Sequence, residues 1–169
     1  TLLTVRLADT VGFRTDQGVD LWLAGVAKAA NKPLWALETV ERQIAALSGG
    51  GDAAQLAALT EAVELIESGK ARAYFQRMLA AWRAGDAAAL DHLLREELSS
   101  EAMAPLFVEM LDRRNREMAD TLIQHLAKGG RPFVAVGAGH FGGASGLLAE
   151  LTGRGYRLRQ VVARAAGND

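Results

Sequence analysis

The sequence contains no cysteine, which excludes disulfide bonds, thiolate zinc sites and a cysteine nucleophile. This absence does not indicate a compartment, because many secreted bacterial proteins also lack cysteine. No apolar run reaches the roughly 18–20 residues that a membrane-spanning helix needs. There is also no excess of charge of one sign: 19 Lys and Arg face 20 Asp and Glu, for a net charge of -1. The chain therefore has no global field that would attract nucleic acid, and we expect no nucleic-acid partner and no membrane span.

What is present is enough apolar material for one core. With 169 residues, half of them hydrophobic, the chain is most simply a single domain over residues 1–169. Residues 52–128 consist almost entirely of helix formers, with breaks at Gly69, at Gly85–Asp86 and at Ser99–Ser100. This composition predicts a large helical insert over residues 52–128.

Local signals set the expected limits of several helices. Apolar residues at helical spacing predict a helix over Asp20–Ala30, and Thr39 is a typical N-cap for the next one. Asp86 is a second N-cap candidate. A long helix follows Ser100, with Pro105 tolerated in its first turn and Gly129–Gly130 ending it.

Three short apolar segments read as β-strands: Leu34–Leu37, Pro132–Val136 and Tyr156–Val162. A helix over Gly143–Thr152 separates the last two, which predicts a strand–helix–strand unit with a right-handed crossover. The fold class expected from these patterns is α/β, with a small β-sheet and the all-helical insert.

The glycine-rich stretch Phe133–Gly146 has two possible uses. Its glycines spell G-x-G-x-x-G from Gly137 to Gly142, which is the dinucleotide-binding fingerprint. That site also needs a carboxylate at the end of the next strand to hold the ribose, and none occurs there before Asp169. The sequence therefore predicts no nucleotide cofactor.

The alternative is that the turn presents His140. Gly137 and Gly139 would let the backbone turn tightly while the imidazole points into a ligand crevice at a strand end. The structural alternative is a histidine that hydrogen-bonds a neighbouring carbonyl. Spacing alone favours the structural alternative, because one histidine does not make a site.

Two charged patches have similar pairs of interpretations. Glu38 follows an apolar segment, so it either complements the start of the next helix or faces the same crevice as His140. Arg113, Arg114 and Arg116 cluster on the long helix. Such a cluster is usually solvated, and the alternative is one arginine turned inward onto a carboxylate or substrate.

These patches occur together in three stretches of the chain, residues 18–47, 113–126 and 132–161. The stretches contain "GVDLWLAG…LETVERQ", "RRNREMAD" and "VGAGHFGGASGLL". In this order they resemble the C-terminal half of the TraB/PrgY/GumN family, to which the Tiki proteases are related. The resemblance implies a fold shared with a haem-binding iron-uptake lipoprotein and with erythromycin-esterase-like hydrolases. It also implies an extracytoplasmic location.

The resemblance implies roles for individual residues. His140 corresponds to the second of two G-x-x-H histidines, which would bind a divalent metal of the Mn or Co type. Glu38 would be a further metal ligand or the catalytic base. Arg114, in the family's R-N pair with Asn115, would orient a carboxylate or stabilise developing negative charge.

Two functions are consistent with the resemblance. The first is a divalent-metal-dependent hydrolase whose substrate is a peptide or another small molecule. The second is a binding protein that takes up haem or a small peptide without turnover. The family's first G-x-x-H has no counterpart in this sequence, which starts without Met in an apolar segment. We therefore expect a C-terminal portion that is inactive alone and prone to form a homodimer.

Overall fold

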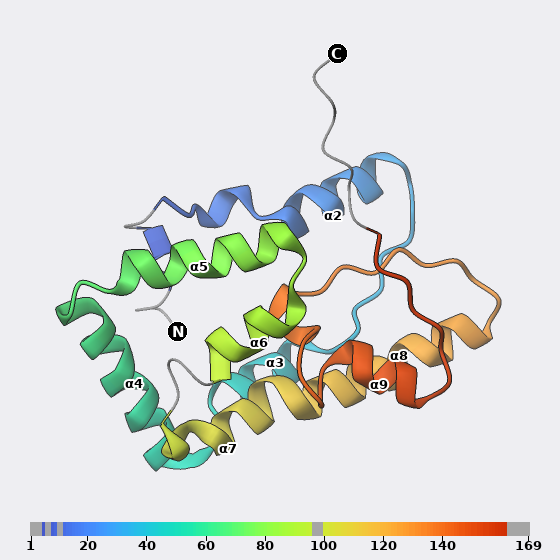
Figure 1. The fold of residues 1–169 in the computed structure, drawn as a ribbon. Coiled ribbons are helices and arrows are strands. Elements are labelled where there is room, and N and C mark those ends of the chain that lie inside the picture. Colours follow the sequence, from blue (N-terminus) through green and yellow to red (C-terminus); the bar gives the residue numbers. More distant parts are fainter. Residues whose placement is uncertain (1–4, 6–7, 10–11, 96–99, 162–169) are drawn as a thin grey trace.

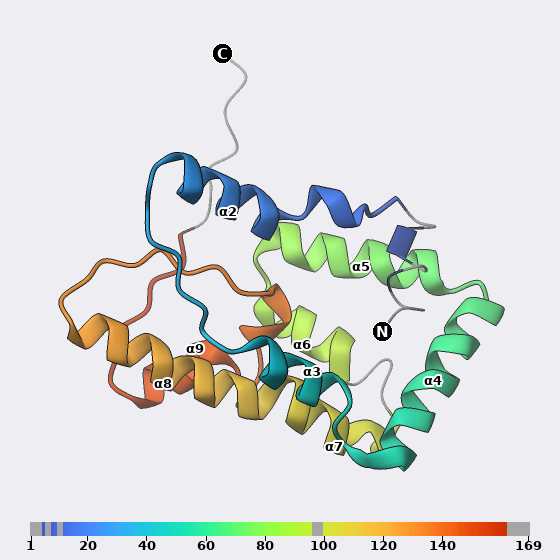
Figure 2. The same cartoon turned by 180° about the vertical axis from the view of Figure 1, so that it is seen from behind.

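The computed structural model describes residues 5, 8–9, 12–95 and 100–161. These residues form helices joined by turns and loops, as Figures 1 and 2 show from opposite sides. In chain order the elements are η1 (Thr15–Gln17), α2 (Val19–Ala29), α3 (Val40–Leu47), α4 (Gly51–Glu67), α5 (Ala71–Ala84), α6 (Ala87–Arg95), η2 (Glu101–Met103), α7 (Ala104–Phe107), η3 (Val108–Asp112), α8 (Arg113–Ala127), η4 (Ala138–His140) and α9 (Leu147–Gly153).

The longest feature is a rod made of α7, η3 and α8, which follow one another without a break. In both views α2 and α5 lie on one side of the molecule and this rod lies on the other, with α6 between them (Figures 1 and 2). One apolar core joins α8 to α9, and it consists of Met118, Ala119, Leu122, Leu147 and Leu151. A second core joins α5 to α6, and it consists of Tyr74, Ala81, Leu90 and Leu93.

The predicted helix limits are confirmed where a capping signal defined them. The Thr39 side chain accepts a hydrogen bond from the backbone N–H of Arg42 at 3.1 Å, so α3 begins with a capped turn. The Asp86 carboxylate accepts from the N–H of Ala89 at 2.9 Å at the start of α6. Pro105 lies at the start of α7, where its missing N–H has no helical partner to lose.

The predicted α/β fold is wrong, because no β-strand occurs in residues 12–95 or 100–161. The segments predicted as strands, 34–37, 132–136 and the described part of 156–162, are loops. A strand exists only when a neighbouring strand pairs with its backbone, and these segments pack on helices instead. Their apolar side chains cover the α8–α9 core; they are Leu37, Val134, Val136 and Tyr156.

The alternation within Pro132–Val136 is nevertheless visible in the structure. Pro132, Val134 and Val136 are half-buried, whereas Phe133 and Ala135 are exposed. The pattern therefore predicted which side chains face the core, but not what the backbone pairs with. The helix expected over Gly143–Thr152 begins later, at Leu147, because the glycine-rich turn continues to Gly146.

The loop before α3 is also held by α8. The Trp35 ring stacks on the His125 imidazole, with centroids 4.1 Å apart and planes inclined by 6°. This contact and the packing of Leu37 bring the end of the loop, where Glu38 lies, onto the long rod. None of the helices in the described part of the chain is long and apolar enough to cross a membrane.

Candidate functional site

The site is built around two consecutive residues, Arg114 and Asn115, in the first turn of α8. Both are buried, and Asn115 is fully inaccessible. They directly follow η3, Val108–Asp112, which is a π-helical turn. A π turn has a wider helical repeat than an α-helix, so it changes the side of the helix to which the following side chains point. Such turns are frequent at functional sites. Neighbouring residues of a helix point about 100° apart, so these two side chains can reach different partners.

Arg114 forms a two-pronged ion pair with Glu38. Its Nε donates to Oε2 at 2.8 Å and its Nη2 donates to Oε1 at 2.5 Å. A third guanidinium nitrogen, Nη1, donates to the carbonyl of Met110 at 2.7 Å, within the π turn. The Arg114 hydrogen bonds hold the pKa of Glu38 below its ordinary value, against the opposing effect of burial. Both carboxylate oxygens of Glu38 are therefore ionised acceptors that are already engaged.

Asn115 contacts His140 from the neighbouring position. The side-chain oxygen of Asn115 lies 2.6 Å from Nδ1 of His140. Its side-chain nitrogen donates to the backbone carbonyl of Ser145 at 2.8 Å. The amide thus bridges the two ends of the glycine-rich turn, which are 137–140 and 143–146.

The His140 imidazole is neutral at neutral pH. Burial lowers its pKa to about 4, with a further lowering by the positive charge of Arg114. The negative charge of Glu38 acts in the opposite direction and is outweighed. Because these charges act on one another, Glu38, Arg114 and His140 form one electrostatic unit. A neutral imidazole has a nitrogen lone pair and can bind a metal or accept a proton.

The glycines with the tightest surroundings in this turn come after His140, although a Cβ on Gly139 would also lie only 2.9 Å from the Leu94 side chain. Gly137 has φ -56° and ψ 135°, a conformation open to any residue. Gly143 has φ +78°, and a Cβ atom there would lie 2.6 Å from a carboxylate oxygen of Asp91. A Cβ atom on Gly142 would overlap the carbonyl oxygen of Ala87. These two glycines allow the turn to lie directly on α6.

Helix α6 is fixed in turn to the π turn. Arg95 donates to Asp91 at 2.7 Å, within α6, and to Asp112 at 2.5 Å, at the end of η3. The guanidinium of Arg95 also lies 5.8 Å from the ring centroid of Phe107. The turn that carries His140 and the helix that carries Arg114 and Asn115 are thus joined through a third element.

The structure brings together the three residues that the sequence singled out. Glu38 pairs with Arg114, so its role is not limited to complementing the start of α3. Arg114 is the buried member of the arginine cluster. Arg113 and Arg116 are exposed and pair at the surface with Glu109 and Glu150. The contact of His140 with a side-chain amide, rather than with a backbone carbonyl, could not be read from spacing. The only signal for it was the occurrence of Asn115 beside Arg114.

The metal-ligating capacity of the site is limited. In the part of the chain that the structure describes, no group of three or more His, Cys, Asp or Glu side chains could hold a metal ion. His140 has one uncommitted ring nitrogen, and both oxygens of Glu38 are engaged by Arg114. These residues offer one imidazole ligand and do not complete a metal centre by themselves, since a protein-bound zinc takes at least three protein ligands.

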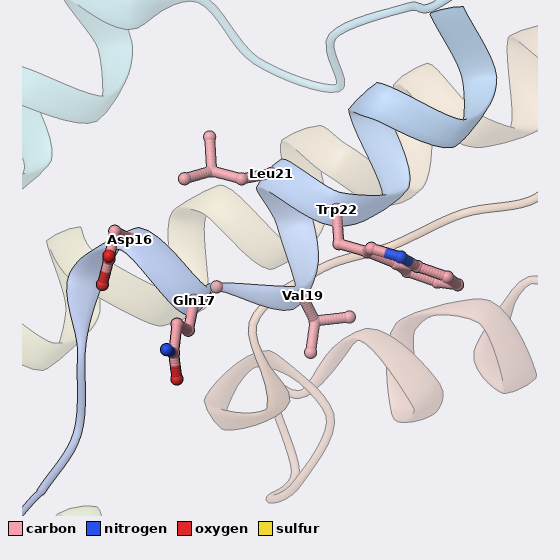
Figure 3. Close-up of a pocket in the computed structure, with 6 residues that line it drawn as sticks. Asp16, Gln17, Val19, Leu21 and Trp22 are labelled. Carbon is pink, nitrogen blue, oxygen red and sulfur yellow. The ribbon is translucent and has the colours of Figure 1, made fainter. Parts of the chain in front are cut away.

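A separate hollow of about 520 Å³ lies at the start of α2 (Figure 3). It is lined by Asp16, Gln17, Gly18, Val19, Leu21 and Trp22. Helix α2 itself lies on the side of the molecule away from the rod (Figure 1). The labelled side chains point in different directions in the close-up (Figure 3). The lining of this hollow does not include Glu38, Arg114, Asn115 or His140. The hollow therefore adds nothing to the site around His140.

The site therefore combines a buried imidazole held by an amide with a largely buried arginine–carboxylate pair, and helices and the turns between them carry these residues. Comparison with known proteins identifies the family of the chain. The model of the TraB/PrgY/gumN family matches residues 1–160, and the chain belongs to this family. Searches of curated proteins and of solved structures each gave no match.

Proposed function

We propose that this chain forms one wall of the active site of a divalent-metal-dependent hydrolase that acts on peptides. The observation that carries the proposal is the state of His140: the ring is neutral, buried and held through Nδ1, which leaves Nε2 uncommitted. Imidazole ligands in metalloproteins are typically held in this way, through the other ring nitrogen.

In this proposal the other ligands in the coordination shell of the metal come from outside the described residues. A divalent cation, when bound, polarises a carbonyl group and lowers the pKa of a water molecule. His140 would contribute one neutral ligand. The chain belongs to the TraB/PrgY/gumN family, and its resemblance to the Tiki proteases is what favours a metal-dependent peptidase.

Arg114 and Glu38 would act electrostatically and by position. Since both oxygens of Glu38 are bound by Arg114, we assign Glu38 to holding the guanidinium rather than to binding the metal. The guanidinium lies close enough to His140 to lower its pKa. A positive charge fixed beside the imidazole would stabilise negative charge that develops on a substrate oxygen.

The test is peptide hydrolysis by the complete protein with Mn²⁺ or Co²⁺ added. His140→Ala should abolish the metal-dependent activity, because it removes an imidazole nitrogen that no described residue binds. His92→Ala is the matched control, since it removes an exposed imidazole on α6. Equal activity of His140→Ala and wild type would remove His140 from the mechanism.

A second candidate function is haem binding without turnover. It is favoured by one observation: the site offers a single free imidazole nitrogen, and one histidine is enough to hold a haem iron. Titration with haem, followed by the Soret band, separates the two functions. A Soret shift in wild type that is lost in His140→Ala, without peptide hydrolysis, would favour the binding protein.

A further inference from the structure

The orientation of the Asn115 amide is set by a neighbour that can only accept hydrogen bonds. The Ser145 backbone carbonyl lies 2.8 Å from one end of the amide, so that end must be the NH₂ group. A flipped amide would place its oxygen against the carbonyl oxygen, and both groups would lack a donor. No water can replace the lost donor, because the Asn115 side chain is fully buried.

The opposite end of the amide, its oxygen, therefore faces His140. An oxygen that only accepts needs a donor on the other side of a 2.6 Å contact, so Nδ1 of His140 must carry the proton. In a neutral imidazole only one nitrogen is protonated, which leaves Nε2 with the lone pair. The Ser145 carbonyl thus fixes the Asn115 amide, and the amide fixes the proton on Nδ1 of His140.

We propose that Asn115 is a positioning residue that holds His140 in the Nδ1-protonated tautomer and keeps the Nε2 lone pair available to a ligand. The ligand role of Nε2 rests on the proposed function, whereas the tautomer rests only on the two hydrogen bonds. This role separates the consecutive residues of α8: Arg114 holds the carboxylate of Glu38, and Asn115 sets the state of the imidazole.

Gly137 lies beside the edge of the ring that carries Nε2. The ring carbon Cδ2, which is bonded to Nε2, is the atom that a Cβ on Gly137 would meet, at 3.7 Å. Gly137 is exposed and has a backbone conformation open to any residue. Neither the backbone nor this ordinary van der Waals contact requires glycine at position 137.

The tautomer can be measured directly on the wild-type chain by ¹⁵N–¹H correlation of the histidine rings near pH 7. His140 is assigned by the loss of its signals in His140→Gln, and the rings of His92 and His125 serve as internal references. The expected spectrum has a protonated Nδ1 and an unprotonated Nε2 at His140. A protonated Nε2 in wild type would overturn the proposal, whatever the variants do.

Two substitutions test the part played by Asn115. Asn115→Asp keeps an oxygen acceptor opposite Nδ1, so Nδ1 should stay protonated, although its second oxygen faces the Ser145 carbonyl and should lower the stability. Asn115→Leu has a similar size but no acceptor, so the Nε2-protonated form should become measurable. An unchanged tautomer in a folded Asn115→Leu would refute the positioning role. If that variant does not fold, the wild-type spectrum alone decides.

A Co²⁺ titration in the complete protein separates this proposal from the proposed function. Loss of the second partner of a metal-binding histidine weakens metal affinity by about 10- to 100-fold, and Asn115→Leu should show a loss of this size. An Nδ1-protonated His140 without any affinity for Co²⁺ would support the positioning role and count against the metal-dependent hydrolase.

Discussion

Removal of the Glu38 carboxylate should destabilise the fold by leaving the Arg114 guanidinium buried without its partner. The Arg114 side chain is only 9% exposed and that of Glu38 is 16% exposed, so solvent screens the pair weakly. Breaking one side of a buried ion pair typically costs about 3–5 kcal/mol. Because Glu38 retains some contact with water, we expect Glu38→Ala to cost about 3 kcal/mol, the lower end of that range.

The measurement is urea unfolding followed by far-UV circular dichroism, which reports the loss of the helices. Small domains have unfolding free energies of about 5–15 kcal/mol, so a loss of about 3 kcal/mol leaves a transition that can still be fitted. Glu41→Ala is the matched control: Glu41 is an exposed acid two residues into α3, and its removal should cost less than about 1 kcal/mol.

A double-mutant cycle distinguishes the effect of an unpaired Arg114 charge from a simple loss of packing. Arg114→Met in the Glu38→Ala background removes the unpaired cation, so the double variant should be more stable than the sum of the two single losses. Arg113→Met, which alters an exposed neighbour, should add to Glu38→Ala without coupling. Equal losses for Glu38→Ala and Glu41→Ala, or a cycle that is additive at Arg114, would refute the ion-pair argument.

Three further predictions concern pH and the glycine-rich turn. The pKa of His140 falls from 6.5 to about 4 on folding, so between these pH values the unfolded chain binds one proton more than the folded chain. The free energy of unfolding should therefore rise with pH across this window. Urea titrations of His140→Gln should show a flatter rise. The Glu38 pair acts in a lower window: its folded pKa is depressed below 4.5, so the stability gap between wild type and Glu38→Ala should be complete above pH 4.5 and close as the pH falls below it. Gly143→Ala should lower the thermal midpoint, because it combines φ +78° with a clash against Asp91, whereas Gly137→Ala should leave it nearly unchanged; equal shifts would contradict the assignment of the turn to Gly143.

Local signals predicted local structure well. Thr39 and Asp86 start helices through hydrogen bonds to residues three positions away, so both partners of each bond lie in the same short stretch of sequence. The fold class failed for the opposite reason. The period-2 pattern of Pro132–Val136 determines which side chains face the core, but a sheet also needs a second segment alongside, and spacing along one segment does not specify that partner.

For the candidate site, too, local features were predictable and contacts between distant segments were not. Its residue types were visible in the sequence, and the structure places Glu38, Arg114 and His140 together. The separate partners of Arg114 and Asn115 could not be predicted, because these contacts depend on the π turn and on the Ser145 carbonyl. The roles of Gly142 and Gly143 were missed for a related reason: they are needed because α6 lies against them, and α6 is distant in sequence.

The π turn at Val108–Asp112 makes the length of this segment more important than its residue types. Deleting one residue would restore regular helical spacing and rotate Arg114 and Asn115 by about 100°, with a shift of about 1.5 Å along the axis. Their partners come from separate loops, so no single re-docking of the helix would recover both contacts. Substitutions within the turn should therefore be tolerated more readily than insertions or deletions. Among relatives of this chain, a gap placed in this turn should mark the loss of the site even where Glu38 and His140 are retained.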